Sequence, residues 1–291
     1  MILFISGRTD ICAFYSTWLK NRIDAGYFDV RNPFNPSLVS RIYASDIDLY
    51  VFCTKNPIPV IPLLKEIKKP IYFMVTLTGY HKDIEVNVLN KKEILESIKE
   101  LSLILGKKNV LLRYDPIFIN DTYTIDYHIK AIEGLMIELK DSIEEITFSF
   151  LDIYKNVRKN YKDINPKVLK DDDYILLSKR FKELSNKYGI KLKTCFEDEV
   201  LKFGFLKGEC ISKELAFRLT GKSFKKWKER DCGCREIVDI GQYNTCNHRC
   251  KYCYANYDEE SIKKNISMHD PNSSLLIGHL KETDIIKVRR K

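Results

Sequence analysis

Short runs rich in Ile, Val, Phe and Tyr alternate along the chain with longer segments whose apolar residues recur at helical spacing. Seven of the runs predict strands, at Ile2–Ser6, Leu49–Cys53, Ile71–Leu77, Val110–Tyr114, Ile146–Phe150, Ile190–Thr194 and Glu236–Ile240. The segments between them predict helices, for example at Ile58–Ile67, Lys91–Leu105, Tyr127–Lys140 and Asp172–Tyr188. Regular alternation of strand and helix is typical of βαβ units, so the pattern predicts an α/β fold with a parallel sheet.

Seven parallel strands favour a TIM-like parallel β/α barrel, full or partial, over an open doubly wound sheet. A chain of 291 residues suits one such unit, so we expect a single β/α-barrel domain over residues 1–291. Loops after the strands build the active site of a barrel on one face. Polar residues follow the first four predicted strands, at Arg8 to Asp10, Thr54 to Pro57, Thr78 to His81 and Asp115 to Ile117. The alternative interpretation is that they form turns and helix caps.

Composition narrows the class of protein. Hydrophobic residues make up 44% and charged residues 31% of the chain, which is typical of globular rather than disordered proteins. The longest apolar runs, such as Ile71 to Leu77, are shorter than the roughly 20 residues of a membrane-spanning helix. The first residues lack the features of a secretory signal, so we expect a cytoplasmic protein. The net charge of +9 is spread among acidic residues and favours a solvated surface over nucleic-acid binding, which stays the alternative.

Seven of the nine cysteines lie between Cys195 and Cys253. Cytoplasmic thiols stay reduced, so clustered cysteines there are more often metal ligands than disulfides. Cys246, Cys250 and Cys253 are close enough in sequence for one loop to hold one metal centre. Three thiolates leave a metal position open, whereas structural zinc is normally closed by four protein ligands. The triad therefore favours an iron–sulfur cluster with an open iron, and zinc with His248 as fourth ligand is the alternative.

The segment Cys246-Asn-His-Arg-Cys250-Lys-Tyr-Cys253 resembles the C-x3-C-x2-C signature of radical S-adenosylmethionine enzymes, including the aromatic residue before the last cysteine. The resemblance implies that the three cysteines hold a [4Fe-4S] cluster whose open iron binds S-adenosylmethionine. One electron, from a donor such as flavodoxin or ferredoxin, then yields a 5′-deoxyadenosyl radical that abstracts hydrogen from a substrate. We therefore expect residues 236–256 to form the cluster-binding strand and loop.

The superfamily usually carries this loop after the first barrel strand, and here it follows the last predicted strand. A circular permutation accounts for that position. With it, Thr9-Asp10 and Thr54-Lys55-Asn56 resemble loops of spore photoproduct lyase and its relatives. Nearly the whole chain also resembles an uncharacterised bacterial family, domain of unknown function 1848. The shared segments are Ser6-Gly-Arg-Thr-Asp10, Thr54-Lys-Asn-Pro57, Arg113-Tyr-Asp-Pro-Ile117 and Asp239-Ile-Gly-Gln-Tyr-Asn-Thr-Cys246.

The remaining late cysteines suggest a second metal centre. Residues 195–235 interrupt the strand and helix rhythm and predict an inserted auxiliary metal-binding element. Four thiolates would close a second iron–sulfur cluster, and structural zinc is the alternative. The four cysteines are Cys195, Cys210, Cys232 and Cys234. Cys12 and Cys53 lie in apolar sequence, so we expect them to be packing residues.

S-adenosylmethionine carries both signs of charge, and the resemblance implies site residues of both signs near the cluster. The catalytic candidates are Asp10, Lys55, Arg113 and Asp115, and the cofactor-binding candidates are Arg8, Thr9, Tyr243, Asn244 and Tyr252. Further residues in and after the end of the fifth predicted strand could meet the substrate, namely Ser149, Asp152, Tyr154 and Lys155. The alternative functions are a non-catalytic iron–sulfur or zinc protein that binds nucleic acid, and a lyase-like DNA repair enzyme.

Overall fold

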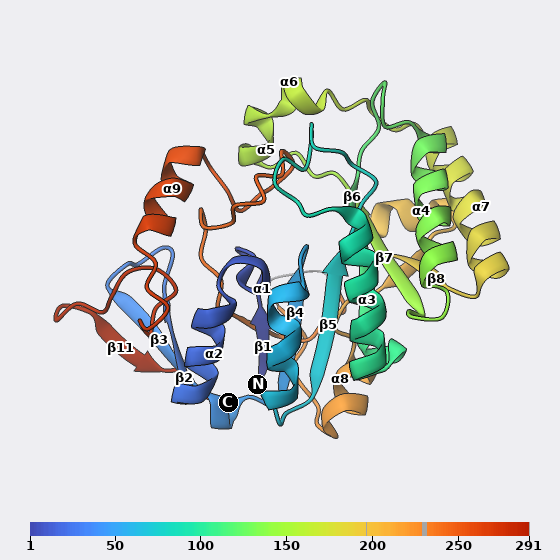
Figure 1. Cartoon of the computed structure of the whole chain (residues 1–291). Coiled ribbons are helices and arrows are strands. Elements are labelled where there is room, and N and C mark those ends of the chain that lie inside the picture. Colours follow the sequence, from blue (N-terminus) through green and yellow to red (C-terminus); the bar gives the residue numbers. More distant parts are fainter. Residues whose placement is uncertain (196, 229–231, 291) are drawn as a thin grey trace.

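A computed structural model of the chain describes residues 1–195, 197–228 and 232–290. Its centre is a sheet of eight strands, every neighbouring pair of which is parallel (Figure 1). In spatial order these are β10 (Val238–Asp239), β1 (Ile2–Ile5), β4 (Leu49–Thr54), β5 (Ile71–Thr76), β6 (Val110–Ile117), β7 (Glu145–Phe150), β8 (Lys191–Cys195) and β9 (Leu206–Gly208). The predicted parallel sheet is confirmed, and each of the seven predicted strands is present in it.

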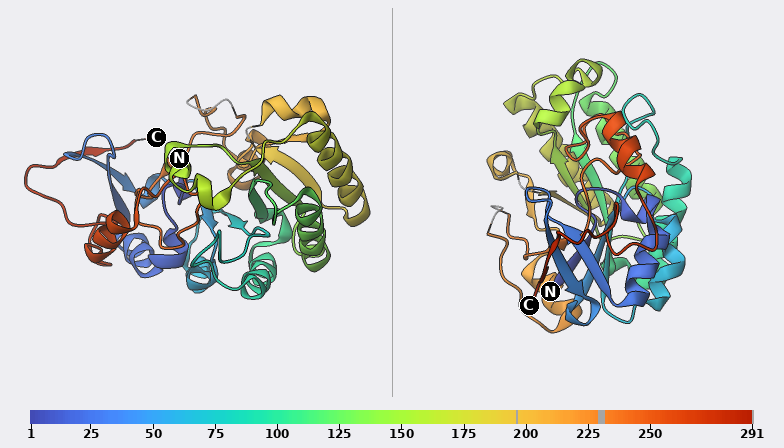
Figure 2. Two further views of the ribbon diagram at one scale, coloured as in Figure 1. Left: turned by 90° about the horizontal axis from the view of Figure 1, so that it is seen from above. Right: turned by 90° about the vertical axis from the view of Figure 1, so that its left-hand side faces the viewer.

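Helices flank the sheet. Their bounds are α1 (Ile11–Phe14), α2 (Ser16–Ala25), α3 (Lys91–Leu105), α4 (Ile125–Leu139), α5 (Lys155–Lys159), α6 (Tyr161–Ile164), α7 (Asp171–Tyr188), α8 (Lys213–Thr220) and α9 (Glu259–Ser267). Seen from above, the sheet curves, with α2, α3, α4 and α7 on its outer side (Figure 2). The helix predicted at Ile58–Ile67 is instead a 3-10 helix, η2 (Ile58–Glu66), because Pro62 inside it lacks the backbone donor that an α-helix needs.

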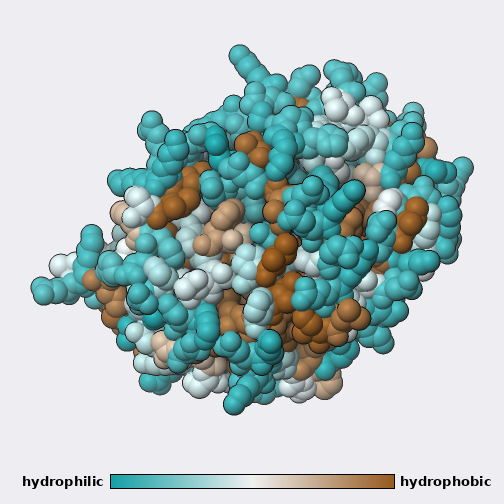
Figure 3. Space-filling model, viewed as in Figure 1, coloured by the Kyte–Doolittle hydropathy of each residue, from teal (hydrophilic) through white to brown (hydrophobic). Residues whose placement is uncertain are grey.

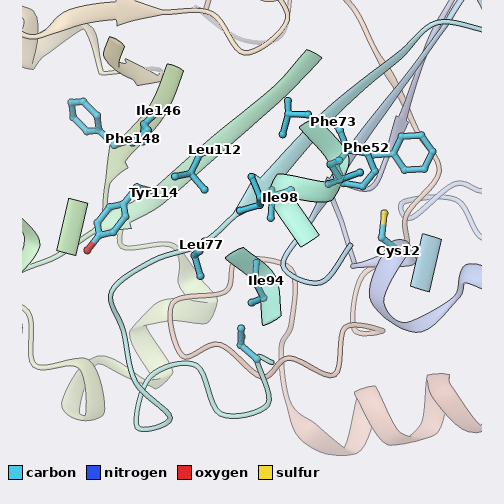
Figure 4. Packing of buried hydrophobic residues seen from close by; sticks show 14 of the residues in the cluster. Cys12, Phe52, Phe73, Leu77, Ile94, Ile98, Leu112, Tyr114, Ile146 and Phe148 are labelled. Carbon is cyan, nitrogen blue, oxygen red and sulfur yellow. The ribbon is translucent and has the colours of Figure 1, made fainter. Parts of the chain in front are cut away.

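The main core lies between the sheet and the outer helices (Figure 4). Phe52 of β4 and Phe73 of β5 are fully buried there and stack with their ring centroids 5.0 Å apart. Leu112 and Phe148 continue this layer on β6 and β7, and Ile98 of α3 packs in the same cluster. Burying each such side chain stabilises the folded state by about 1.5–3 kcal/mol. This layer therefore holds the strands, and with them the strand ends, in position.

A second, smaller core covers the opposite face of the sheet. Successive strand residues point to opposite faces, so Val51 belongs to this core while its neighbour Phe52 belongs to the main one. Ala216 of α8 packs here together with Cys210, Cys232 and Cys234. The segment that interrupts the strand and helix rhythm therefore closes this face of the sheet.

A small second sheet was not predicted. Its strands are β2 (Tyr27–Arg31), β3 (Leu38–Tyr43) and β11 (Ile285–Val288), in the order β11-β3-β2. The C-terminal segment reaches it after crossing α2, where the indole Nε1 of Trp18 donates to the carbonyls of Ser273 and Leu275 at 2.9 and 3.0 Å. These contacts join segments more than 250 residues apart in the sequence. Contacts at such a separation cannot be predicted from local sequence patterns.

The surface agrees with the scattered charge of the sequence. The face shown in Figure 3 is mostly hydrophilic, and its apolar patches are small and separate. In the part of the chain that the structure describes, no helix combines the length and apolar character needed to cross a membrane.

Candidate functional site

The cysteine loop follows β10 and lies beside the loops that follow β1 and β4. This placement arises because β10 pairs with β1 and β1 with β4, all in parallel, so their carboxyl ends meet at one edge of the sheet (Figure 1). Arg8 links the loop after β1 to β10. Its Nε lies 3.0 Å from Asp239 Oδ2, and its Nη2 donates to the Asp239 carbonyl at 2.8 Å. The guanidinium also stands 5.8 Å from the ring centre of Tyr243.

The three cysteines of the loop are enclosed thiols. Cys246 and Cys250 are buried and Cys253 is half-buried. Burial raises the pKa of all three thiols above the ordinary value. The Ala255 amide donates to Cys253 Sγ at 3.4 Å. Buried thiols of this kind lose their protons when a cationic centre compensates the charge, so the donor set suits a bound iron–sulfur cluster.

Hydrogen bonds from distant elements fix the backbone of the loop. Tyr15 Oη donates to the Thr245 carbonyl at 2.6 Å, and Asn256 Nδ2 donates to the Cys246 carbonyl at 2.8 Å. From the loop after β7, Asn160 Nδ2 donates to the Lys251 carbonyl at 2.7 Å. The loop is therefore supported from both sides of the sheet edge.

Two predicted cofactor-binding residues shape this loop. Asn244 has φ +57°, in the left-handed region that residues other than glycine rarely adopt. Its Oδ1 accepts a hydrogen bond from the Tyr257 amide at 2.5 Å. Thr9 Oγ1 accepts from Thr245 Oγ1 at 2.7 Å, which links the loop to the end of β1. Both residues thus hold the cysteine loop in place, and their role in cofactor binding stays a prediction.

Asp10 is the common acceptor of three loops. Its Oδ1 accepts from the Ala13 amide at 3.0 Å, as the N-cap of α1, and from Thr54 Oγ1 at 2.7 Å. Its Oδ2 accepts from the Lys55 amide at 2.8 Å and lies 2.9 Å from His248 Nε2. The carboxylate is buried, and its contacts with the Lys55 amide and with His248 join the loop after β4 to the cysteine loop.

His248 lies inside the cysteine loop but is turned toward Asp10. Its Nδ1 is buried with no hydrogen-bond partner, and its ring centre is 4.7 Å from that of Phe14. Because Nε2 is engaged by the carboxylate, this geometry gives no support to His248 as a fourth zinc ligand beside the cysteines.

Glu85 is a site residue that the sequence did not reveal. It follows β5, and its Oε1 accepts from Lys55 Nζ at 2.7 Å, from Thr78 Oγ1 at 2.8 Å and from the hydroxyl of Tyr252. Lys91 Nζ stands 3.4 Å from Oε2. Burial acts to raise the pKa of Glu85, but the charges of Lys55 and Lys91 lower it to about 2. Two predicted residues, Lys55 and Tyr252, thus meet at one carboxylate.

The other two catalytic candidates form a separate group. Arg113 and Asp115 of β6 form an ion pair, and Ser149 Oγ donates to the Asp115 carboxylate. Arg113 Nη1 also donates to Cys210 Sγ at 3.2 Å. The pair therefore lies against the second cysteine group rather than at the Glu85 network.

The structure gathers the second group of cysteines on the face of the sheet covered by α8. Cys195 ends β8, and its sulfur lies 3.3 Å from that of Cys210. Cys232 and Cys234 are buried in the same small core, against which Cys53 packs as well. Over the described ranges, no three or more Cys, His, Asp or Glu side chains are arranged to hold a metal ion. The first metal centre, on Cys246, Cys250 and Cys253, and the second one therefore both stay predictions.

Glu197 is a further carboxylate on this side of the molecule, and its Oε1 accepts from the Phe150 amide at 2.8 Å. Burial raises its pKa to about 7, and the negative charges of Asp152 and Asp115 act in the same direction. The folded chain therefore holds this proton more tightly than the unfolded chain, whose carboxyl has a pKa near 4.5. Its contribution to stability is complete below pH 4.5 and is lost as the pH rises through about 7.

Glu197→Gln is expected to flatten this pH dependence, because the amide has no proton to lose. Urea unfolding at several pH values between about 4.5 and 8 measures the effect, with the neighbouring exposed Glu199→Gln as control. Parallel curves for the wild type and Glu197→Gln would contradict the raised pKa.

The sequence was compared with known families and proteins. Residues 2–255 match the family described as Domain of unknown function (DUF1848), a range that includes the parallel sheet and the cysteine loop but not α9 and β11. No curated protein matches the chain. Because the match spans most of the sequence, the chain belongs to the DUF1848 family.

Proposed function

We propose that this protein is a radical S-adenosylmethionine enzyme with a [4Fe-4S] cluster on Cys246, Cys250 and Cys253. The observation that carries the proposal is the position of three enclosed thiols on one loop, at the carboxyl edge of a parallel sheet, beside the loops after β1 and β4. When bound, the cluster would supply the electron that splits S-adenosylmethionine into methionine and the 5′-deoxyadenosyl radical, the species that removes hydrogen from a substrate. A donor such as flavodoxin or ferredoxin would provide that electron.

We also propose that the sheet is a circularly permuted, partial β/α barrel. The support is that β10 is an edge strand paired in parallel with β1. If β10 takes the place of the first barrel strand, β1 becomes the second and β4 the third. The cysteine loop then follows the first strand, where the superfamily carries it.

The chain's own residues would arrange this site in two ways. Arg8 and Asp10 hold the loops after β10, β1 and β4 together, and Thr9 bonds to the cysteine loop directly. Lys55 and Tyr252 stand on the Glu85 side of the cysteines and offer an ammonium and an aromatic ring. We therefore propose that Lys55 and Tyr252 border the S-adenosylmethionine site, with Tyr243 on the Arg8 side.

A second iron–sulfur cluster on Cys195, Cys210, Cys232 and Cys234 completes the proposal. Its support is that four cysteines from three segments meet in one small core next to the Arg113 guanidinium. A cation near thiolates favours their charged form, which is the form that binds metal.

The test of the radical chemistry is formation of 5′-deoxyadenosine. The protein is reconstituted anaerobically with iron and sulfide, reduced with dithionite and mixed with S-adenosylmethionine, with Cys250→Ala as the matched control. We expect the nucleoside from the wild type and none above background from the variant. A fully loaded wild-type cluster that forms no nucleoside would contradict the proposal, and salt-dependent nucleic-acid binding would then be measured.

A further inference from the structure

Lys55 places an enclosed positive charge beside the cysteine loop. Its side chain is only 12% exposed, and its Nζ stands 5.5 Å from the ring centre of Tyr252, one of the two residues between Cys250 and Cys253. The ammonium therefore stands beside the segment that joins two of the three proposed ligands.

Glu85 holds that ammonium in place. The backbone of Glu85 pairs with that of Cys250 in an isolated antiparallel bridge, and the Lys251 amide donates to the Ile84 carbonyl at 3.0 Å. The Glu85 carboxylate then binds Lys55 at 2.7 Å. The segment that carries the carboxylate and the loop that carries the thiols are thus joined through their backbones.

The charges of this group do not cancel. Lys55 and Lys91 contribute two positive charges and Glu85 one negative charge, so the group has a net charge of +1. Side chains of Thr78 and Tyr252 donate to the same carboxylate. A buried charge acts strongly on its neighbours because the protein interior screens it less than water does.

We propose that Lys55, positioned by Glu85, compensates the negative charge of the thiolate-bound centre proposed for the cysteine loop and raises its reduction potential. This inference rests on the proposed function. Reduction adds one electron, and hence one negative charge, to a thiolate-bound cluster, so a nearby fixed cation stabilises the reduced state more than the oxidised state. Lys55 keeps its proton throughout, and the electron comes from the external donor. Lys55 and Glu85 are positioning residues that act on the potential.

The experiment is a potentiometric titration of the anaerobically reconstituted full-length chain, followed by electron paramagnetic resonance. Lys55→Met, which removes the charge and keeps the length, is expected to shift the midpoint potential in the negative direction. Glu85→Gln removes the opposite charge and is expected to shift it in the positive direction. Lys55→Arg is expected to restore the wild-type value, and Lys91→Met to shift it less than Lys55→Met because its side chain is 34% exposed.

The opposite signs of the two expected potential shifts distinguish an effect of charge from a general disturbance of the structure. Unchanged potentials, or shifts of the same sign in Lys55→Met and Glu85→Gln, would overturn the inference and leave the proposed function standing. If Lys55→Met retains no cluster, its iron content is compared with that of Lys55→Arg. Full iron in the arginine variant supports charge compensation, and loss in both variants overturns it. Failure of the wild type to bind a cluster would overturn the proposed function and this inference with it.

Discussion

Replacing Asp10 with alanine is expected to lower the free energy of unfolding by about 3–5 kcal/mol, the range seen when one partner of a buried polar network is removed. The carboxylate caps α1 and accepts hydrogen bonds from Thr54 and the Lys55 amide, and it lies 2.9 Å from His248 Nε2. Without it, these groups are buried without their acceptor, and His248 has no partner on either ring nitrogen.

Urea unfolding of the metal-free protein measures this loss. Asp24→Ala is the control, because the Asp24 carboxylate pairs with Lys20 on the exposed side of α2 and such pairs contribute no more than about 1 kcal/mol. Equal, small effects of the two substitutions would contradict the role assigned to Asp10. A variant too unstable to isolate would agree with it, and Asp10→Asn then gives an intermediate value.

Cys210→Ala is expected to abolish metal binding at the second cysteine group while the first cluster stays loaded. Cys210 lies at the centre of the group, since its sulfur contacts both that of Cys195 and the guanidinium of Arg113. Metal analysis of the anaerobically purified wild type and variant gives the result directly, and it also decides between iron and the alternative zinc. We expect only the amount held by Cys246, Cys250 and Cys253 to remain.

Two controls make this measurement specific. Cys53→Ala removes a thiol that packs against the same core but is outside the proposed ligand set, so the second centre is expected to stay. Cys250→Ala is expected to lose the first centre and keep the second. Metal in Cys210→Ala equal to that of the wild type would refute the second centre, and loss in Cys53→Ala would contradict the four-cysteine assignment.

Most of the main sheet was predictable because strands such as β4 and β5 are almost wholly buried and appear as continuous apolar runs, whereas the short and largely exposed β9 was not predicted. The helix at Lys91–Leu105 was predicted with the bounds that it has, since Asn90 caps its start and Gly106 follows its end. The second sheet was not, because β11 is exposed along its whole length and pairs with β3, far away in sequence. Such a strand has neither an apolar run nor a local partner to identify it.

The site was predictable where it follows strands. The carboxyl ends of parallel strands share one edge, and this rule made candidates of four residues: Arg8, Thr9, Asp10 and Lys55. The residues that they contact in the folded chain were not predicted. Glu85 was missed because it stands well past the end of β5, in a stretch with no motif, and only the folded chain brings it to Lys55 and Tyr252. The spacing of the cysteines along the sequence indicates which residues could bind a metal. The position of a carboxylate that accepts hydrogen bonds from several loops depends instead on the tertiary structure.

The pairing of β10 with β1 also sets an order of events during synthesis. Gly7 and Asp239 are bonded across 232 residues of chain, which a ribosome adding about 5–20 residues per second needs on the order of tens of seconds to make. Throughout that time β1 has an unpaired edge, and Arg8 lacks its carboxylate partner. Any metal bound by the cysteine loop would therefore reach a chain whose other strands of the main sheet have already been synthesised. A product that stops before Asp239 would carry the open edge without the thiols of the loop.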